Sequence, residues 1–150
     1  MTREVVILIA EDDAGHARLI EKNLRRVGLH NAVLRFENGQ EILDFLLCRG
    51  DGPKRAPDKP YMLLLDIRMP KVDGIEVLRQ IKSHSVLRKL PVSMLTTTDD
   101  PREVAHCHEL GCNSYIVKPV DYEKFSEAIE QFGMFVSLVE VRAIRSPPPA

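Results

Sequence analysis

Side chains that can bind metal ions or phosphate stand directly after four apolar segments of the chain. The acids at 11–13 follow the run VVILIA, and Asp66 follows YMLLL. Thr96 follows PVSML, and Lys118 follows SYIV. A carboxylate can attack a phosphoryl group, further carboxylates can hold a divalent cation, and a lysine can hold phosphate oxygens. These positions suit phosphoryl transfer to a carboxylate, provided that the fold brings them together.

The apolar runs before these residues are typical of strands that are buried on both faces. The predicted strands are 5–10, 32–36, 61–65, 91–95 and 114–117. Segments with helical spacing of apolar residues alternate with them. Predicted helices cover 14–27 and 74–81, with others after the Asn38-Gly39 turn, from Asp100-Pro101 to Gly111, and from about Tyr122.

This alternation predicts an α/β protein with one parallel sheet and helices on both faces. Five units favour a flavodoxin-like (βα)5 doubly wound sheet with strand order 2-1-3-4-5. Ligands of such sheets bind at the carboxyl ends of the strands, where the order reverses. We therefore expect the residues after the first, third, fourth and fifth strands to converge, whereas the second strand delivers no comparable residue.

Carboxylates that share a pocket repel one another unless a cation joins them, and Mg²⁺ prefers oxygen ligands of this kind. Each residue also has an ordinary explanation. The acids at 11–13 are suitable caps for the next helix, Asp66 for a turn, and Lys118-Pro119 for a loop. Their joint placement at adjacent strand ends favours a shared site.

The same segments resemble response-regulator receiver domains of two-component signalling, from about Val5 to Phe132. The matching pieces are ILIAEDD, LLLDIRMPKVDGIEVL, LPVSMLTTT and YIVKP. The resemblance implies that a sensor histidine kinase phosphorylates Asp66. It also implies a signalling protein rather than an enzyme, because a receiver assists only its own phosphorylation and dephosphorylation.

The resemblance further assigns a role to each residue of the site. The implied ligands of Mg²⁺, or of another divalent cation such as Mn²⁺, are Glu11, Asp12, Asp66 and the backbone carbonyl of Arg68. Lys118 is similar to the lysine that binds the phosphoryl group. Thr96 and Tyr115 resemble the switch pair, in which the hydroxyl turns toward the phosphate and the aromatic ring follows inward.

Two positions depart from the family pattern. Arg68 stands where small or amide residues are frequent, and its side chain at the mouth of the pocket could pair with Glu11 or the phosphate, or hinder an attacking water. Thr97 stands where alanine or glycine is usual, which narrows access for the kinase. Both departures affect the expected rates of phosphorylation and hydrolysis. They leave open a degenerate receiver that binds partners without phosphorylation.

Two further alternatives fit less well. A phosphohydrolase with an aspartyl nucleophile would need a second Asp two residues after the first, and this chain has Arg68 there. A flavin-binding flavodoxin would need a loop rich in Ser, Thr and Gly after the first strand, where this chain has acids.

The amino-acid composition favours a cytoplasmic protein without a nucleic-acid or membrane partner. The 21 basic and 22 acidic residues nearly cancel, and no apolar stretch reaches the roughly 18 residues of a membrane span. The three cysteines do not have the spacing of a zinc site, so we expect free thiols in a reducing compartment.

We expect residues 1–150 to form a single receiver domain with its core at about 4–132. Only 32 residues follow Lys118, too few for an attached DNA-binding module, so a change in protein contacts would be the output. The apolar extension at 133–145 predicts a homodimer, and 146–150 a disordered tail. The proline-rich loop before the third strand, VLRKLPVSMLTTTDD and the C-terminal segment resemble stand-alone regulators that serve phytochrome kinases.

Overall fold

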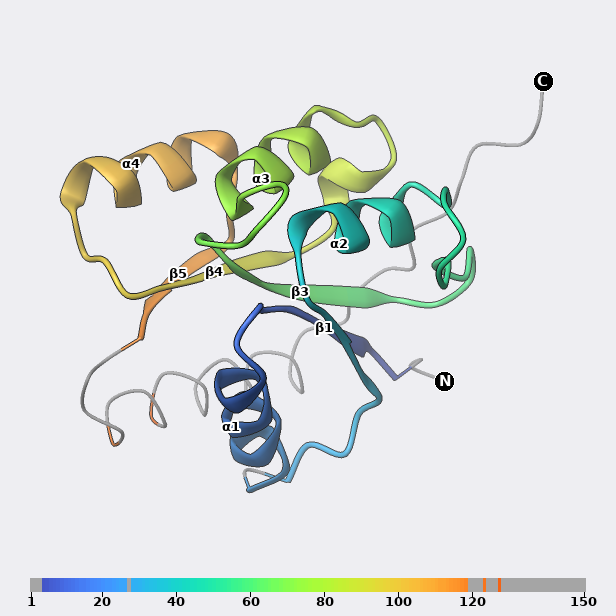
Figure 1. Cartoon of the computed structure of the whole chain (residues 1–150), viewed down its shortest axis with the longest axis horizontal. Helices are drawn as coiled ribbons and strands as arrows, with labels where there is room; N and C mark the ends of the chain where they lie inside the picture. Colours follow the sequence, from blue (N-terminus) through green and yellow to red (C-terminus); the bar gives the residue numbers. More distant parts are fainter. Residues whose placement is uncertain (1–3, 27, 119–122, 124–126, 128–150) are drawn as a thin grey trace.

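The computed structural model describes residues 4–26, 28–118, 123 and 127. A parallel sheet of five strands forms the middle layer (Figure 1). Helix α1 (Ala14–Arg26) covers one face of the sheet. On the opposite face lie α2 (Gly39–Leu46), α3 (Gly74–Ser83) and α4 (Pro101–Leu110), with a short 3-10 helix at Leu87–Lys89. The strand order is β2-β1-β3-β4-β5, so the predicted flavodoxin-like doubly wound fold is confirmed.

The strands are β1 (Val6–Ala10), β2 (Val33–Phe36), β3 (Tyr61–Asp66), β4 (Val92–Thr96) and β5 (Ser114–Val117). Every residue of β3 and β4 is buried, as expected for central strands that helices cover on both faces. In the parallel register Asp66 lies beside Leu95, and Thr96 beside Val117. The register therefore brings the carboxyl ends of β3, β4 and β5 to the same edge of the sheet.

Each face of the sheet has its own apolar core. Leu8 and Leu63 pack with the residues of α2, α3 and α4, while Ile7 and Leu64 pack with those of α1. Neighbouring residues of one strand enter different cores because successive side chains point to opposite faces. Full burial of one such side chain contributes roughly 1.5–3 kcal/mol to folding. The two cores hold the strand ends in place from both sides.

Individual residues define the starts of α3 and α4 and the end of α4. The carboxylate of Asp73 accepts a hydrogen bond from the backbone N of Glu76 at 2.9 Å and caps α3. Asp100 caps α4 in the same way, ahead of Pro101. Gly111 ends α4 with a φ of 103°, a left-handed conformation that favours glycine. The predicted start and end of this helix are confirmed.

The loop before β3 is mostly exposed, as its glycines, prolines and charges indicate, but Arg55 and Pro60 within it are buried. Arg55 is buried, and its Nε donates to the carbonyl oxygen of Leu46 at 2.7 Å. The backbone N of Arg55 donates to the carbonyl oxygen of Phe45 at 3.1 Å. Arg55 thus satisfies carbonyl groups at the end of α2, which no intrahelical donor can reach.

Several predictions concern residues outside the described part of the chain. These are the last helix from about Tyr122, the extension at 133–145 with its expected homodimer surface, and the tail at 146–150. Within the described ranges, no helix combines the length and apolar character needed to cross a membrane.

Candidate functional site

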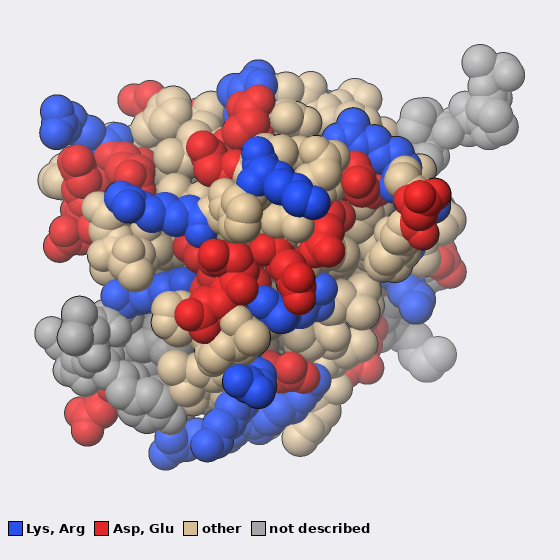
Figure 2. Space-filling model, in the orientation of Figure 1, with Lys and Arg blue, Asp and Glu red and all other residues tan. Residues whose placement is uncertain are grey.

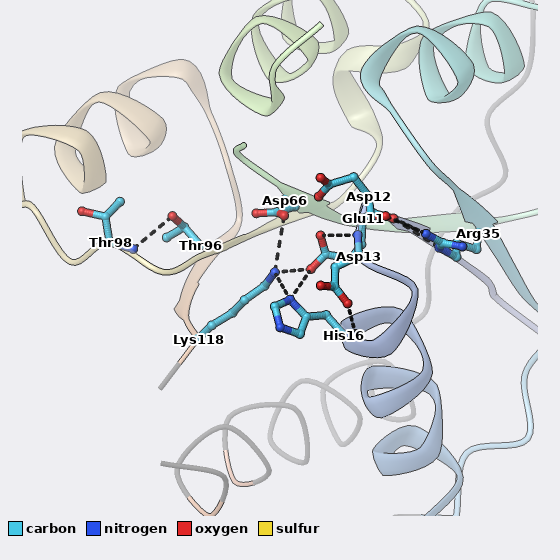
Figure 3. A network of polar contacts seen from close by, with 9 residues as sticks. All are labelled: Glu11, Asp12, Asp13, His16, Arg35, Asp66, Thr96, Thr98 and Lys118. Atoms are coloured by element: carbon cyan, nitrogen blue, oxygen red, sulfur yellow. Dashed lines mark hydrogen bonds and ion pairs between the residues drawn. The ribbon is translucent and has the colours of Figure 1, made fainter. Parts of the chain in front are cut away.

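The segment after β1 brings two acids to the carboxyl edge of the sheet (Figure 3). Glu11 is fully buried, and Asp12 is exposed. Asp13 has a different role, because its carboxylate accepts a hydrogen bond from the backbone N of His16 at 2.9 Å. That bond caps the first turn of α1 and lowers the pKa of Asp13. The helix-capping explanation therefore holds for Asp13.

Asp66 is the last residue of β3, which is one residue longer than predicted. It is nearly buried and lies against the start of α3. A Cβ at position 74 would be only 2.1 Å from the carbonyl oxygen of Asp66, and the N–H of Gly74 donates to the carbonyl oxygen of Ile67 at 2.7 Å. Only glycine permits this approach, so the loop after Asp66 is held by the first turn of α3.

Lys118 reaches from the end of β5 to the acids of β1 and β3 (Figure 3). Its Nζ donates to Oε1 of Glu11 and lies 3.4 Å from Oδ2 of Asp66. The side chain of Lys118 is only 9% exposed, so water screens this charge weakly. One ammonium group therefore serves two carboxylates.

The acids carry more negative charge than Lys118 neutralises. One carboxylate oxygen each of Glu11, Asp12 and Asp66 lies within 4.8 Å of the other two. Burial and the hydrogen bond with Asp66 raise the pKa of Glu11, while burial and the neighbouring Glu11 raise the pKa of Asp12. Converging carboxylate oxygens of this kind suit a hard divalent cation such as Mg²⁺ or Mn²⁺. The donor set fits the expected metal.

Thr96 and Tyr115 meet at the loop that follows β4. Thr96 is buried, and its Oγ1 accepts a hydrogen bond from the backbone N of Thr98 at 3.2 Å. The hydroxyl of Tyr115 donates to the carbonyl oxygen of Thr98 at 3.1 Å and lies 3.3 Å from a carboxylate oxygen of Glu103 in α4. Burial and the charge of Glu103 raise the pKa of Tyr115. Both predicted switch residues therefore contact Thr98.

Two contacts of the site were not predicted (Figure 3). Nδ1 of His16 lies 3.3 Å from Oε1 of Glu11 and 3.4 Å from Nζ of Lys118. Arg35 of β2 donates to the backbone carbonyl oxygens of Glu11 and Asp12 at 3.0–3.2 Å. Arg35 lies within the second strand and contacts the backbone of the acidic segment, so it adds no side chain to the group of carboxylates. An arginine that binds only backbone carbonyl groups has no partner side chain that could be recognised in the sequence.

Arg68 and Thr97, which depart from the family pattern, are both exposed. In the described part of the chain Glu11 pairs with Lys118 and His16, so the suggested pairing of Arg68 with Glu11 is not formed.

On the face shown in Figure 2, acidic side chains gather near the centre with basic side chains around them. Neither sign of charge covers the whole face.

The sequence matches the family described as response regulator receiver domain over residues 7–130. The chain belongs to this family. It is 36% identical over 126 residues to the probable methanogenesis regulatory protein FilR2 of Methanothrix harundinacea, covering 84% of this chain and 79% of FilR2. It is 33% identical over 132 residues to the response regulator Rcp1 of Synechocystis, covering 86% of this chain and 88% of Rcp1.

Solved structures of receiver domains are similar along nearly the whole chain. The receiver domain from Rhodospirillum rubrum is 42% identical, with a TM-score of 0.86 over 94% of this chain and 99% of that one. The Mn²⁺-bound form of Rcp1 has a TM-score of 0.81 at 28% identity, covering 92% and 99%. The bacteriophytochrome response regulator RtBRR has a TM-score of 0.73 at 35% identity, covering 98% and 85%. The predicted family is confirmed, and receiver domains are signalling proteins.

Proposed function

We propose that the protein is a response regulator in which Asp66 accepts a phosphoryl group from a sensor histidine kinase in the presence of Mg²⁺ or Mn²⁺. One observation carries this proposal. The carboxylate of Asp66 lies 3.4 Å from the ammonium of Lys118, and one of its oxygens lies within 4.8 Å of one carboxylate oxygen each of Glu11 and Asp12. Membership of the receiver family supports it. The protein acts on itself and signals through its contacts, with no external substrate.

In this reaction a carboxylate oxygen of Asp66 forms a bond to phosphorus while the bond between phosphorus and the donor nitrogen of the kinase histidine breaks. Glu11, Asp12 and Asp66, with the backbone carbonyl of Arg68, would hold the divalent cation, which when bound would supply positive charge beside the phosphoryl oxygens. Lys118 exchanges its hydrogen bond with Glu11 for one to a phosphoryl oxygen, so its positive charge stays inside the site.

The phosphoryl group adds about 1.5 to 2 negative charges and new acceptor oxygens beside Thr96. The Thr96 side chain then turns so that its hydroxyl donates to a phosphoryl oxygen, and Oγ1 moves away from the backbone N of Thr98, whose hydrogen bond it accepts before phosphorylation. Tyr115 holds the carbonyl of the same Thr98, so the loop and the start of α4 respond together. We propose that this rearrangement of the loop and α4 changes the surface that a partner recognises.

The kinase in this proposal is a bacteriophytochrome. The support is the likeness to RtBRR, which is itself a bacteriophytochrome response regulator. Transfer from a purified, autophosphorylated bacteriophytochrome within seconds would support the pairing, and transfer only from unrelated kinases would contradict it.

Homodimer formation through 133–145 remains part of the proposal. Sedimentation velocity with and without phosphodonor tests it, and a strict monomer in both conditions would contradict it.

The phospho-acceptor assignment is tested with a small phosphodonor such as acetyl phosphate and Mg²⁺. We expect intact mass spectrometry to detect one added phosphoryl group, which hydroxylamine removes because an acyl phosphate is labile to it. Asp66→Asn abolishes the gain, while the control Asp99→Asn, at an exposed acid in the loop after β4, retains it. A wild-type protein that gains nothing, or an Asp66→Asn variant that still gains the group, would refute the assignment.

A further inference from the structure

Arg35 contacts the acidic segment at two successive peptide groups (Figure 3). Its Nε and Nη2 donate to the carbonyl oxygen of Glu11 at 3.2 and 3.0 Å, and Nη2 also donates to the carbonyl oxygen of Asp12 at 3.0 Å. Arg35 lies in β2 beside Ile9 of β1. Its side chain therefore extends past the end of β1 to the segment that leaves the sheet.

We propose that Arg35 is a positioning residue, which orients the backbone of Glu11 and Asp12 so that their carboxylates face a divalent cation. This inference rests on the proposed function of the site. The carbonyl groups of both residues point at one guanidinium, whose planar fork fixes the directions in which it donates. Since the peptide orientation sets the direction of each side chain, Arg35 restricts both acids without touching either carboxylate.

The positive charge of Arg35 and its hydrogen bonds have opposite effects on the binding of a divalent cation. A positive charge near a divalent cation repels it and weakens binding. The carboxylate of Glu37 lies 3.6 Å from Nη1 of Arg35 and offsets part of this charge. Removal of the guanidinium therefore shows which of the two effects is larger, because they change the affinity for the cation in opposite directions. Loss of positioning weakens binding of the cation, whereas loss of repulsion alone strengthens it.

The chain contains a matched control in Arg25 of α1. Its Nη1 donates to the carbonyl oxygens of Leu29 and Asn31 at 3.1 and 2.6 Å. Arg25 thus also holds two carbonyl groups with one guanidinium, but it does so in the connection between α1 and β2. Arg25→Gln removes a comparable set of hydrogen bonds without changing the contacts of the acidic segment.

The test uses the full chain and measures binding of Mg²⁺ by titration calorimetry and of Mn²⁺ by electron paramagnetic resonance of the free ion. We expect Arg35→Gln to raise the dissociation constant about tenfold, the lower end of what is lost when a partner that orients a metal ligand is removed. Arg35→Lys also weakens binding, because an ammonium group keeps the charge without the planar fork. Arg25→Gln leaves the dissociation constant unchanged.

The phosphorylation rate provides a second readout. In Arg35→Gln the Mg²⁺ concentration for half-maximal rate rises, while the rate at saturating Mg²⁺ matches the wild type. Binding by Arg35→Gln that equals or exceeds the wild type would overturn the inference, as would an equal loss in Arg25→Gln. Either result leaves the proposed function intact. A wild-type protein that binds neither cation would overturn the inference together with the proposed metal site.

Discussion

Replacement of Gly74 by alanine tests whether the first turn of α3 holds the loop after Asp66. An ideal Cβ at position 74 would lie 2.1 Å from the carbonyl oxygen of Asp66 and 2.8 Å from the Cα of Ile67, both of them backbone atoms. Ordinary contact begins at 3.4 Å, so the Cβ and the carbonyl oxygen must move apart by about 1.3 Å. Rotation of a side chain cannot relieve this clash, because each partner belongs to the backbone.

The cost follows from the contacts that the movement changes. Separation breaks the 2.7 Å bond from the N–H of Gly74 to the carbonyl oxygen of Ile67, which costs about 1 kcal/mol. Overpacking adds about 1–3 kcal/mol, and the better helix propensity of alanine returns at most about 1 kcal/mol. We expect the free energy of unfolding to fall by about 2 kcal/mol, which lowers the Tm by roughly 4–8 °C.

Urea denaturation followed by circular dichroism measures this change. Gly52→Ala is the control, because no atom lies within 4 Å of the Cβ it would add. Displacement of Asp66 by about 1 Å also slows phosphorylation, and a misplacement of this size costs about 100-fold in rate. A Gly74→Ala variant as stable and as rapidly phosphorylated as Gly52→Ala would refute the close approach of α3 to the loop after Asp66.

Three further predictions follow from burial and charge. Arg55→Met removes the charged donor to the carbonyl oxygen of Leu46, and urea denaturation should give a loss of about 2 kcal/mol. Burial raises the pKa of the Cys107 thiol from 9.0 to about 11. The unfolded chain loses this proton more readily than the folded protein, so the free energy of unfolding falls as the pH rises from 9 to about 11. The fall is less steep in Cys107→Ala. Saturating Mg²⁺ should raise the Tm of the wild type in differential scanning fluorimetry, whereas Asp12→Asn abolishes this rise.

The site residues that the sequence predicted are those that follow apolar runs. Asp66, Thr96 and Lys118 could be placed because buried strands are recognisable, and because parallel strands must end at the same edge. The end of α4 at Gly111 could be predicted from the residue type, since glycine readily adopts the left-handed conformation that ends this helix. In each of these cases the local sequence and the overall fold point to the same structure.

Arg35 and Arg55 were missed because their partners are backbone carbonyl groups. Every residue carries a carbonyl group, so no pattern of side chains marks the one that a distant arginine will reach. Arg55 stands in a stretch of glycine, proline and charge that is typical of exposed loops, yet it is buried. His16 lies in the first turn of α1, where its backbone N donates to Asp13 and its ring approaches Glu11. Contacts of this kind become visible only in the folded structure.

Borohydride trapping tests most directly whether Asp66 is the phospho-acceptor. Borohydride reduces an aspartyl phosphate to homoserine, and tandem mass spectrometry of the digested protein then locates the change. After incubation with a phosphodonor and Mg²⁺, we expect homoserine at position 66, and none when the phosphodonor is omitted. Homoserine at Asp12 or Asp13 in place of Asp66, or at no position, would contradict the assignment.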